Sequence, residues 1–229
     1  MRKKSEIKKA AFAFIVLMGI VSLFSDVTHE GAASIIGAYL SLAGASAAAI
    51  GFTSGLGGFI GYSLRLITGM VADRTGKYWP MTILGYIIDC MAIPALALVP
   101  RGGWILACGL IVLQRIGKAV KKPAKDTLLS FAATQYGIGK GFAIQEVMDQ
   151  IGAVLGPVIL FLVLLLKQND DLFSAYSACF LILGVPALIT VLLLLFARHK
   201  FPNPERFEPD TKTAAKFKMN RAFILYIIA

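Results

Sequence analysis

Charged side chains are scarce in this chain. Asp, Glu, Lys and Arg make up only 16% of its 229 residues, against roughly a quarter in an average soluble protein. Hydrophobic residues account for 57% of the chain, and the mean hydropathy is +0.74. This balance excludes a disordered chain and argues against a soluble enzyme.

Residues that build disulfide frameworks and metal centres are also few. The three cysteines, Cys90, Cys108 and Cys179, all lie in apolar blocks, and the two histidines are His29 and His199. Their spacing matches no metal-ligand pattern. A G-x-x-x-x-G-K-[ST] phosphate loop is absent from the sequence as well. We therefore expect no metal, no cofactor, no ATP-driven step and no enzymatic activity.

Long hydrophobic blocks dominate what is present. A helix needs about 20 residues to cross a bilayer core of roughly 30 Å, and the sequence contains six blocks of that kind. They cover residues 10–40, 45–71, 78–99, 103–130, 142–166 and 172–197. We predict an all-α bundle of six transmembrane helices. Because the connections are short, consecutive helices are expected to be antiparallel neighbours.

The remaining segments complete the predicted domain plan. Residues 1–9 form a basic tail, and residues 10–197 form the six-helix bundle. Residues 198–221 are polar, of mixed charge, and contain three prolines, so they indicate a solvated linker. Residues 222–229, AFILYIIA, begin a seventh apolar run.

The distribution of basic residues predicts the orientation in the membrane. With the N-terminus inside, 15 basic residues fall in cytoplasmic segments, and only Arg101 and Lys167 fall in external loops. Basic residues concentrate on the cytoplasmic side of membrane proteins. The net charge of +10 is thus mainly a consequence of topology. We expect a multi-pass protein of the cell membrane with a cytoplasmic N-terminus, whose partner is the lipid bilayer and not nucleic acid.

Several charged side chains nevertheless lie inside the predicted spans. Each costs roughly 2.5–3.5 kcal/mol at mid-membrane on insertion scales. These residues are Asp26, Glu30, Arg65, Asp89, Arg115, Lys118, Lys121, Lys122, Lys125, Glu146 and Asp149. If all of them faced lipid, the sum would exceed a typical protein stability of about 5–15 kcal/mol. They must pair with one another or line a water-filled passage, as in a transport pathway.

Antiparallel hairpins predict which of these charges share a depth. A turn near Gly76 places Arg65 level with Asp89, which suggests a structural ion pair. A turn near Tyr136 places Lys122 and Lys125 level with Glu146 and Asp149. This cytoplasmic-end cluster is either a structural salt-bridge network or a gate that opens and closes.

A second set of charges lies nearer the middle of the membrane. Asp26 and Glu30 share one face of the first helix, and Arg115 and Lys118 lie near the centre of the fourth. If the bundle consists of two inverted triplets of helices, the first and fourth helices occupy equivalent positions. The acids and bases would then face each other across a cavity. Substrate binding, proton coupling and static pairing all remain open for this set.

The segment GMVADRTGK, between the second and third spans, resembles the signature loop of the major facilitator superfamily, G-x-x-x-D-[RK]-x-G-[RK]. The matching positions are Gly69, Asp73, Arg74, Gly76 and Lys77. Gly69 would allow close helix contact, and Gly76 would serve a tight turn.

Two further segments are similar to patterns of the same family. Arg115 resembles the arginine of the family's fourth helix. GAVLGP, with Gly152, Gly156 and Pro157, resembles the Gly-Pro motif of the fifth helix in exporters, but Val158 and Ile159 replace the glycines that usually follow.

The resemblance implies a fold of twelve helices in two six-helix halves, joined by a cytoplasmic linker. It also implies alternating access to a midplane site, with Asp73 engaging the opposite half. This chain would supply one half, the linker and the start of helix seven, and the missing C-terminal half would be its partner.

We expect a secondary transporter for a small-molecule substrate, with proton coupling. The alternatives are a half transporter that self-associates and a membrane scaffold that transports nothing.

Overall fold

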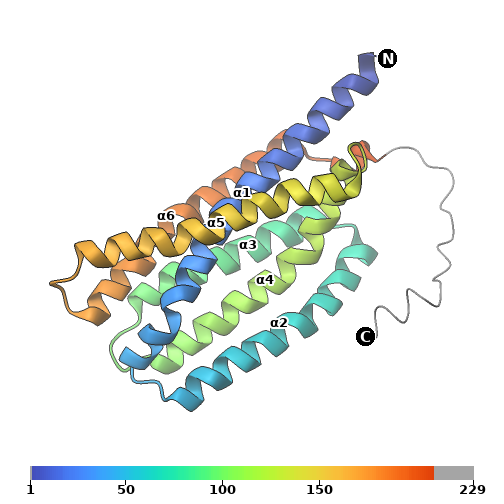
Figure 1. The fold of residues 1–229 in the computed structure, drawn as a ribbon. Coiled ribbons are helices and arrows are strands. Elements are labelled where there is room, and N and C mark those ends of the chain that lie inside the picture. Colours follow the sequence, from blue (N-terminus) through green and yellow to red (C-terminus); the bar gives the residue numbers. More distant parts are fainter. Residues whose placement is uncertain (1, 209–229) are drawn as a thin grey trace, which may run out of the picture.

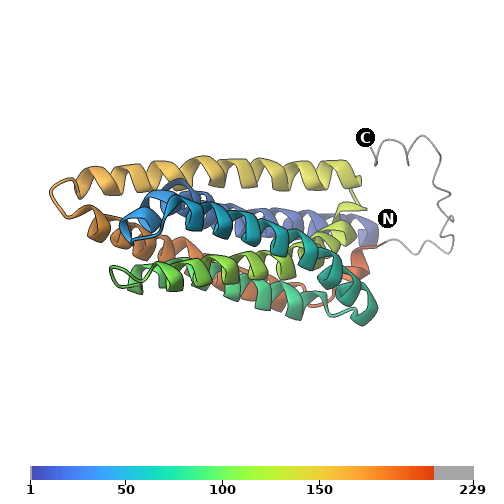
Figure 2. The same ribbon diagram turned by 90° about the horizontal axis from the view of Figure 1, so that it is seen from below.

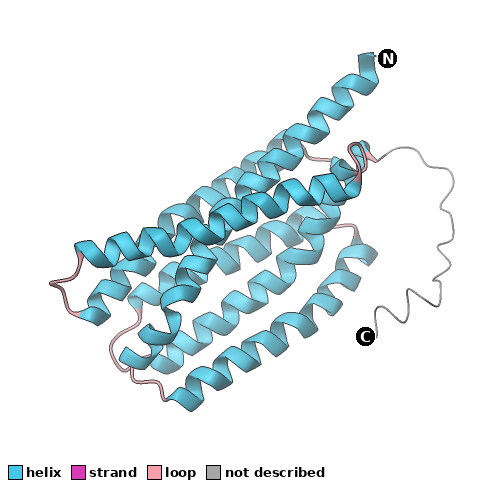
Figure 3. Cartoon of the chain, viewed as in Figure 1, coloured by secondary structure: helices cyan, strands magenta, loops and turns pink. Residues whose placement is uncertain are grey.

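The computed structural model describes residues 2–208, and this part of the chain is helical throughout, with short loops (Figures 1 and 3). The prediction of an all-α bundle with six long helices is confirmed. The α-helices are α1 (Arg2–Leu42), α2 (Ala47–Thr75), α3 (Tyr78–Ala95), α4 (Trp104–Ala133), α5 (Ile138–Leu166) and α6 (Leu172–Lys200). Two short 3₁₀ helices, η1 (Leu96–Leu98) and η2 (Pro204–Phe207), follow α3 and α6.

Five of the six helices, all but α4, are long and apolar enough to cross a membrane. Helix α4 has 30 residues but carries six charged side chains between Arg115 and Asp126. Its length is that of a spanning helix, and its polar side chains must therefore be covered by neighbouring helices or face water. Neighbouring helices bury two of the six, Lys121 and Lys125.

The helices do not pack in the order of the chain. Helix α1 packs mainly on α5 and α6, whereas α4 packs mainly on α3 and α2. Figure 1 shows α4 between α2 and α3, and Figure 2 shows the same helices from below. The expectation that consecutive helices are neighbours is therefore wrong for most pairs. Short loops fix the direction of the next helix but not the helix on which it packs.

Close backbone contact joins α5 to α1. A Cβ atom added at Gly152 would lie 2.4 Å from the carbonyl oxygen of Leu23, and one at Gly156 would lie 2.5 Å from that of Val27. Only glycine allows two helices to approach so closely. The Gly152–Gly156 motif thus packs α5 closely against α1, and Pro157 directly follows the motif.

Local capping explains where two helices begin and one ends. Ser46 accepts a hydrogen bond from the Ala49 amide at 3.2 Å at the start of α2. Asp171 caps α6, and the Ser174 backbone N–H, which donates to its carboxylate, holds the pKa of that carboxyl below its usual range. At the other end of α2, Gly76 adopts φ 63° and its N–H donates to Ala72, as the tight turn predicted there requires.

Three residues in the first part of the predicted linker pack against the bundle, although most of that part is exposed. Pro204 and Phe207 are buried, and the Trp79 indole donates to the carbonyl oxygen of Phe201 at 3.1 Å. The rings of Phe201 and Phe207 both contact the ring of Phe14. The aromatic side chains in this polar sequence account for the contact, because they bury large apolar areas. The rest of the predicted linker and residues 222–229 lie outside the described residues.

The glycine contact between α5 and α1 predicts a stability difference between two substitutions in the same helix. Gly156→Ala should lower the free energy of unfolding by about 1–3 kcal/mol, because the new methyl group meets a backbone carbonyl that cannot move freely. Gly139→Ala is the control, since a Cβ atom there meets no atom within 4 Å. Thermal unfolding in detergent, followed by tryptophan fluorescence, measures both. Equal melting temperatures for the two variants would contradict the tight contact.

Candidate functional site

Two polar stripes face each other along α1 and α4. On α1 the stripe consists of Ser22, Ser25 and His29, and on α4 it consists of Gln114, Lys121 and Lys125. The side chains pair in antiparallel order: Lys125 Nζ donates to Ser22 at 2.7 Å, Lys121 Nζ donates to Ser25 at 2.9 Å, and Gln114 Nε2 is 2.9 Å from His29 Nδ1. Both stripes follow the helical period, so each lies on one helix face.

Asp89 of α3 enters this network from a third helix. Its side chain is fully buried. It accepts a hydrogen bond from Lys121, forms a 2.5 Å contact with His29 Nε2, and accepts a 3.0 Å hydrogen bond from Gln114. A buried carboxylate requires such partners, because an unpaired charge in a low-dielectric interior costs several kcal/mol.

Two glycines bring α3 close enough to α4 for these contacts. A Cβ atom added at Gly117 would lie 2.6 Å from the amide nitrogen of Asp89, and one at Gly85 would lie 2.5 Å from that of Lys121. The Lys121 ammonium also lies 3.9 Å from the centre of the buried Tyr86 ring, a cation–π contact. Lys121 is thus surrounded by an acid, a hydroxyl and an aromatic face.

The predicted ion pair between Arg65 and Asp89 is wrong. Asp89 is bound by Lys121, His29 and Gln114, and none of the ion pairs in residues 2–208 contains Arg65. The physical reason is the packing order, since α2 and α3 both pack on α4 and have little contact with each other. The Nε of Arg65 is buried without a hydrogen-bond partner among the described residues.

The predicted cluster of Lys122, Lys125, Glu146 and Asp149 forms only in part. Lys122, Lys125 and Asp149 line one cavity, but Lys122 pairs with Asp126 at 3.1 Å and Lys125 donates to Ser22. Glu146 is exposed elsewhere and accepts a hydrogen bond from Gln150 at 2.8 Å.

Helical geometry explains why Glu146 does not join the cluster. Residues Gln145, Asp149, Gly152 and Gly156 form the stripe of α5 that turns toward α1 and the bundle interior. Glu146 follows Gln145 by one residue, which rotates its side chain by about 100° to the outside. Sharing a depth is therefore not sufficient for contact.

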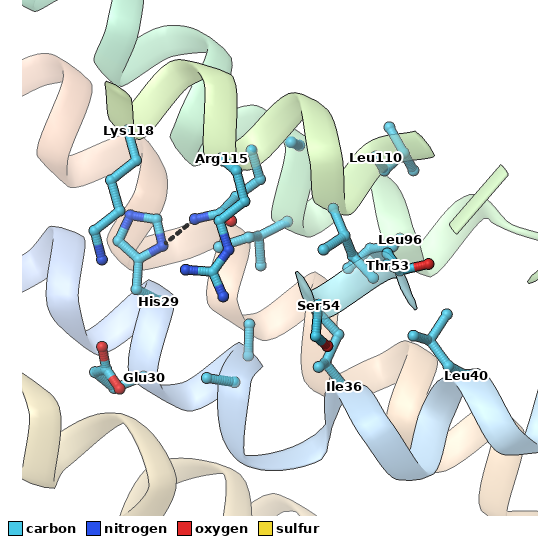
Figure 4. Close-up of a pocket in the computed structure, with 16 residues that line it drawn as sticks. His29, Glu30, Ile36, Leu40, Thr53, Ser54, Leu96, Leu110, Arg115 and Lys118 are labelled. Atoms are coloured by element: carbon cyan, nitrogen blue, oxygen red, sulfur yellow. Dashed lines mark hydrogen bonds between the residues drawn. The ribbon is translucent and has the colours of Figure 1, made fainter. Parts of the chain in front are cut away.

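The mid-membrane acids and bases do meet in cavities of the bundle. One of them, about 390 Å³, is lined by Glu30 and His29 of α1, by Thr53 and Ser54 of α2, and by Gln114, Arg115 and Lys118 of α4. Figure 4 shows Arg115 and Lys118 reaching from α4 toward the α1 segment that carries His29 and Glu30. Glu30, Arg115 and Lys118 thus share this cavity, whereas Asp26, expected beside them, does not line it.

Two smaller cavities adjoin the same side chains. One, of about 150 Å³, is lined by charged groups that include Asp26, Glu30, Lys118, Lys121 and Asp149. The other, of about 130 Å³, lies between α2 and α4 and is lined by Arg65, Arg115 and Lys118. Lys118 lines all three cavities, so α4 is the helix around which the polar interior is organised.

The loop that resembles the family signature lies at the end of the bundle where α2 ends and α3 begins. Asp73, Arg74 and Lys77 are exposed, and none of them forms an ion pair within residues 2–208. A Cβ atom at Gly69 would lie 3.7 Å from Pro123 of α4, an ordinary packing distance. Gly69 is therefore near α4, but its lack of a side chain is not what permits that contact.

The charge pattern of the sequence does not identify the partners of Asp89. Lys121, His29 and Gln114 contact the Asp89 carboxylate. Charge and depth in the membrane alone do not predict these contacts. The available signal is the helical period of the polar residues: positions 22, 25 and 29 on one helix and 114, 121 and 125 on the other. Two such stripes in antiparallel helices predict a ladder of hydrogen bonds.

These features define a class of protein: a multi-pass helical membrane protein whose bundle encloses polar, charged cavities. The sequence pattern of the Major Facilitator Superfamily matches residues 10–229. The chain belongs to this family of transporters, as the signature loop predicts.

Similar proteins are longer than this chain. It is 39% identical, over 199 residues, to an uncharacterized protein of Mycobacterium tuberculosis, with 87% of this chain and 47% of that protein covered. It is 28% identical, over 204 residues, to an uncharacterized MFS-type transporter of Methanocaldococcus jannaschii, with coverages of 89% and 49%. A multidrug resistance protein of Photorhabdus laumondii is 30% identical over 118 residues, which cover 51% of this chain and 28% of that protein. The chain thus spans about half the length of the first two relatives.

The buried Asp89–Lys121 pair predicts strong energetic coupling. Asp89→Asn should cost about 3–5 kcal/mol of unfolding free energy, because Lys121 is left without its charge partner. The double variant Asp89→Asn/Lys121→Met should recover part of that loss, so that the effects are not additive. Unfolding of the four proteins of this cycle in detergent measures the coupling. Neutralising the exposed Lys167–Asp170 pair is the control, and its effect should stay within about 1 kcal/mol. Additive effects at Asp89 and Lys121 would contradict the network.

Proposed function

We propose that this chain forms the N-terminal half of a secondary transporter that moves a small solute across the cell membrane by alternating access. The observation that carries the proposal is the meeting of Glu30, Arg115 and Lys118 in one cavity inside the bundle. Charged groups are expensive in a membrane unless they pair or face water. A cavity lined by both signs of charge, within a family of transporters, fits a solute pathway.

The second half of the pathway belongs to the same proposal. Helix α2 and helix α5 carry large exposed apolar side chains, among them Phe52, Phe59 and Leu66 on α2 and Val154 and Phe161 on α5. The M. tuberculosis and M. jannaschii relatives are about twice as long as the matched region. A second six-helix half, joined through the linker, would close the cavities from the open side. The exposed Asp73 would then engage that half, as the resemblance implies.

Proton coupling is the finer part of the proposal. Asp26 and Glu30 are only partly buried, and both line the 150 Å³ cavity beside Lys118 and Lys121. A carboxyl group in a cavity that opens to one side at a time can take up a proton on one face and release it on the other. Asp26 and Glu30 are the carboxylates we assign to this role, whereas Asp89 is held by three partners.

Alternating access can be tested without knowing the solute. In a background with Cys90, Cys108 and Cys179 replaced by alanine, Ser54→Cys places one thiol in the 390 Å³ cavity. A membrane-impermeant maleimide should label this thiol in right-side-out and in inside-out vesicles, because the cavity opens to each side in turn. Labelling from one side only, whatever the conditions, would contradict alternating access.

The proposed orientation gives the matched controls for that experiment. Asn169→Cys lies in the exposed connection between α5 and α6, and Lys140→Cys lies near the start of α5. With a cytoplasmic N-terminus, Asn169→Cys should be labelled only in right-side-out vesicles and Lys140→Cys only in inside-out vesicles. The reverse pattern would invert the topology while leaving the cavity argument unchanged.

A further inference from the structure

The cavity of about 130 Å³ between α2 and α4 differs from its neighbours because all of its charged residues are basic. Arg65 lines it from α2, and Arg115 and Lys118 line it from α4. Within residues 2–208, no acidic side chain lines it. In the adjoining 150 Å³ cavity, by contrast, Asp26, Glu30 and Asp149 accompany the lysines.

The two arginines lack the neutralisation that the nearby lysines have. Lys121 pairs with Asp89, and Lys122 pairs with Asp126. Within residues 2–208, no carboxylate oxygen lies within 4.0 Å of a nitrogen of Arg65 or Arg115. The Arg65 guanidinium instead lies 5.1 Å from the centre of the Tyr62 ring, and its buried Nε has no hydrogen-bond partner there. Both guanidinium groups keep hydrogen-bonding capacity for a ligand.

The glycines of α2 make room beside these arginines. A Cβ atom at Gly57 would lie 3.2 Å from Cγ of Arg115, which is tighter than ordinary contact. The arginine side chain therefore lies against a helix face that has no side chains at Gly57 and Gly61. This packing keeps Arg115 in the cavity that Arg65 lines from the other helix.

The nearest acids line the neighbouring cavities and not the 130 Å³ cavity. Glu30 faces the 390 Å³ cavity together with His29, Arg115 and Lys118, and Asp26 faces the 150 Å³ cavity. Lys118 lines both of these cavities and forms no ion pair within residues 2–208. Figure 4 shows Glu30 on the α1 side of the cavity, with Arg115 and Lys118 on the opposite, α4 side. Lys118 thus shares both of these cavities with the acids of α1, whereas the 130 Å³ cavity brings Lys118, Arg65 and Arg115 together with no acid among residues 2–208.

We propose that the solute carries an oxyanion group, a carboxylate or a phosphate, and that Arg65 and Arg115 bind it. Guanidinium groups bind such groups through paired, charge-assisted hydrogen bonds. Because this part of the bundle lies within the membrane, a bound anion would also remove the cost of two unpaired cations. The assignment rests on the proposed transport function and adds the chemical class of the solute.

Thermal unfolding of the full-length gene product in an uncharged detergent tests this assignment. Sodium phosphate and sodium succinate are the oxyanion probes, sodium chloride at matched ionic strength is the reference, and tetraethylammonium chloride is the cationic probe. At least one oxyanion should raise the melting temperature in a saturable way, because a ligand that binds only the folded state stabilises it. No shift with either oxyanion, or a shift with tetraethylammonium alone, would overturn the assignment.

Variants locate the binding group. Arg65→Gln and Arg115→Gln should each raise the half-saturating oxyanion concentration by about tenfold or more, consistent with the loss of a charge-assisted hydrogen bond. Lys140→Gln removes an exposed positive charge that does not line the cavity, and it should leave the half-saturating concentration unchanged. Arg65→Lys and Arg115→Lys keep the charge but lose the paired geometry, so they should bind with intermediate strength. Equal half-saturation in all variants would overturn the site.

Two glycine substitutions test whether the position of the Arg115 side chain matters when its charge is unchanged. Gly57→Ala should weaken oxyanion binding by displacing Arg115, whereas Gly55→Ala, where a Cβ atom meets no atom within 4 Å, should not. Equal half-saturating concentrations for these two variants would overturn the positioning role of Gly57.

A measurement with added phospholipid distinguishes a free oxyanion solute from a lipid headgroup. Stabilisation by phosphatidylglycerol in mixed micelles, without any by phosphate or succinate, would assign the arginines to a lipid headgroup and overturn the solute assignment. If no oxyanion stabilises the protein but Ser54→Cys is labelled from both sides, the proposed transport function stands and only the assignment of an anionic solute is contradicted. Failure of the labelling experiment would remove transport itself.

Discussion

Neutralisation of buried charge is the constraint on which the rest of this bundle depends. Asp89 lies in the interior of a protein whose surroundings are hydrocarbon, and an isolated carboxylate could not remain charged there. Lys121, His29 and Gln114 supply its partners from two other helices. One carboxylate therefore ties α1, α3 and α4 together at a single depth. Any movement between these three helices would have to break or exchange those contacts.

Glycine provides the short distances that this neutralisation needs. Gly85 and Gly117 allow α3 and α4 to approach until the Asp89 side chain reaches Lys121. Gly152 and Gly156 allow an equally close approach of the α5 and α1 backbones. Between helices in a membrane the hydrophobic effect contributes little, so close packing and polar contacts must hold them together. The two contacts differ in their consequence, because the first brings Asp89 to Lys121 and the second joins α5 to the helix that carries Ser22, Ser25 and His29.

The polar interior divides into a neutralised part and a part that is open to a ligand. Asp89, Lys121, Ser25 and Ser22 form hydrogen bonds within the protein, which suits a structural core. Arg65 and Arg115 line cavities and form no ion pair within residues 2–208. Lys118 lies on the boundary, since it lines all three cavities and shares two of them with acids of α1. A solute that bound at the arginines would thus act directly beside the network that joins the helices.

The sequence by itself determined the membrane bundle, its helices and its family, because hydropathy blocks and the GMVADRTGK loop are local features. It also predicted that Asp26 and Glu30 face Arg115 and Lys118 across a cavity if the bundle consists of two inverted triplets. Glu30, Arg115 and Lys118 do share one cavity, but Asp26 lines another. Only the tertiary structure decided which helices are neighbours. It separated Arg65 from Asp89 by placing α4 between them, and it turned Glu146 outward while Asp149 faces inward. Depth in the membrane follows from position along the chain, but contact also depends on the rotation and lateral packing of each helix, which many weak side-chain contacts decide together.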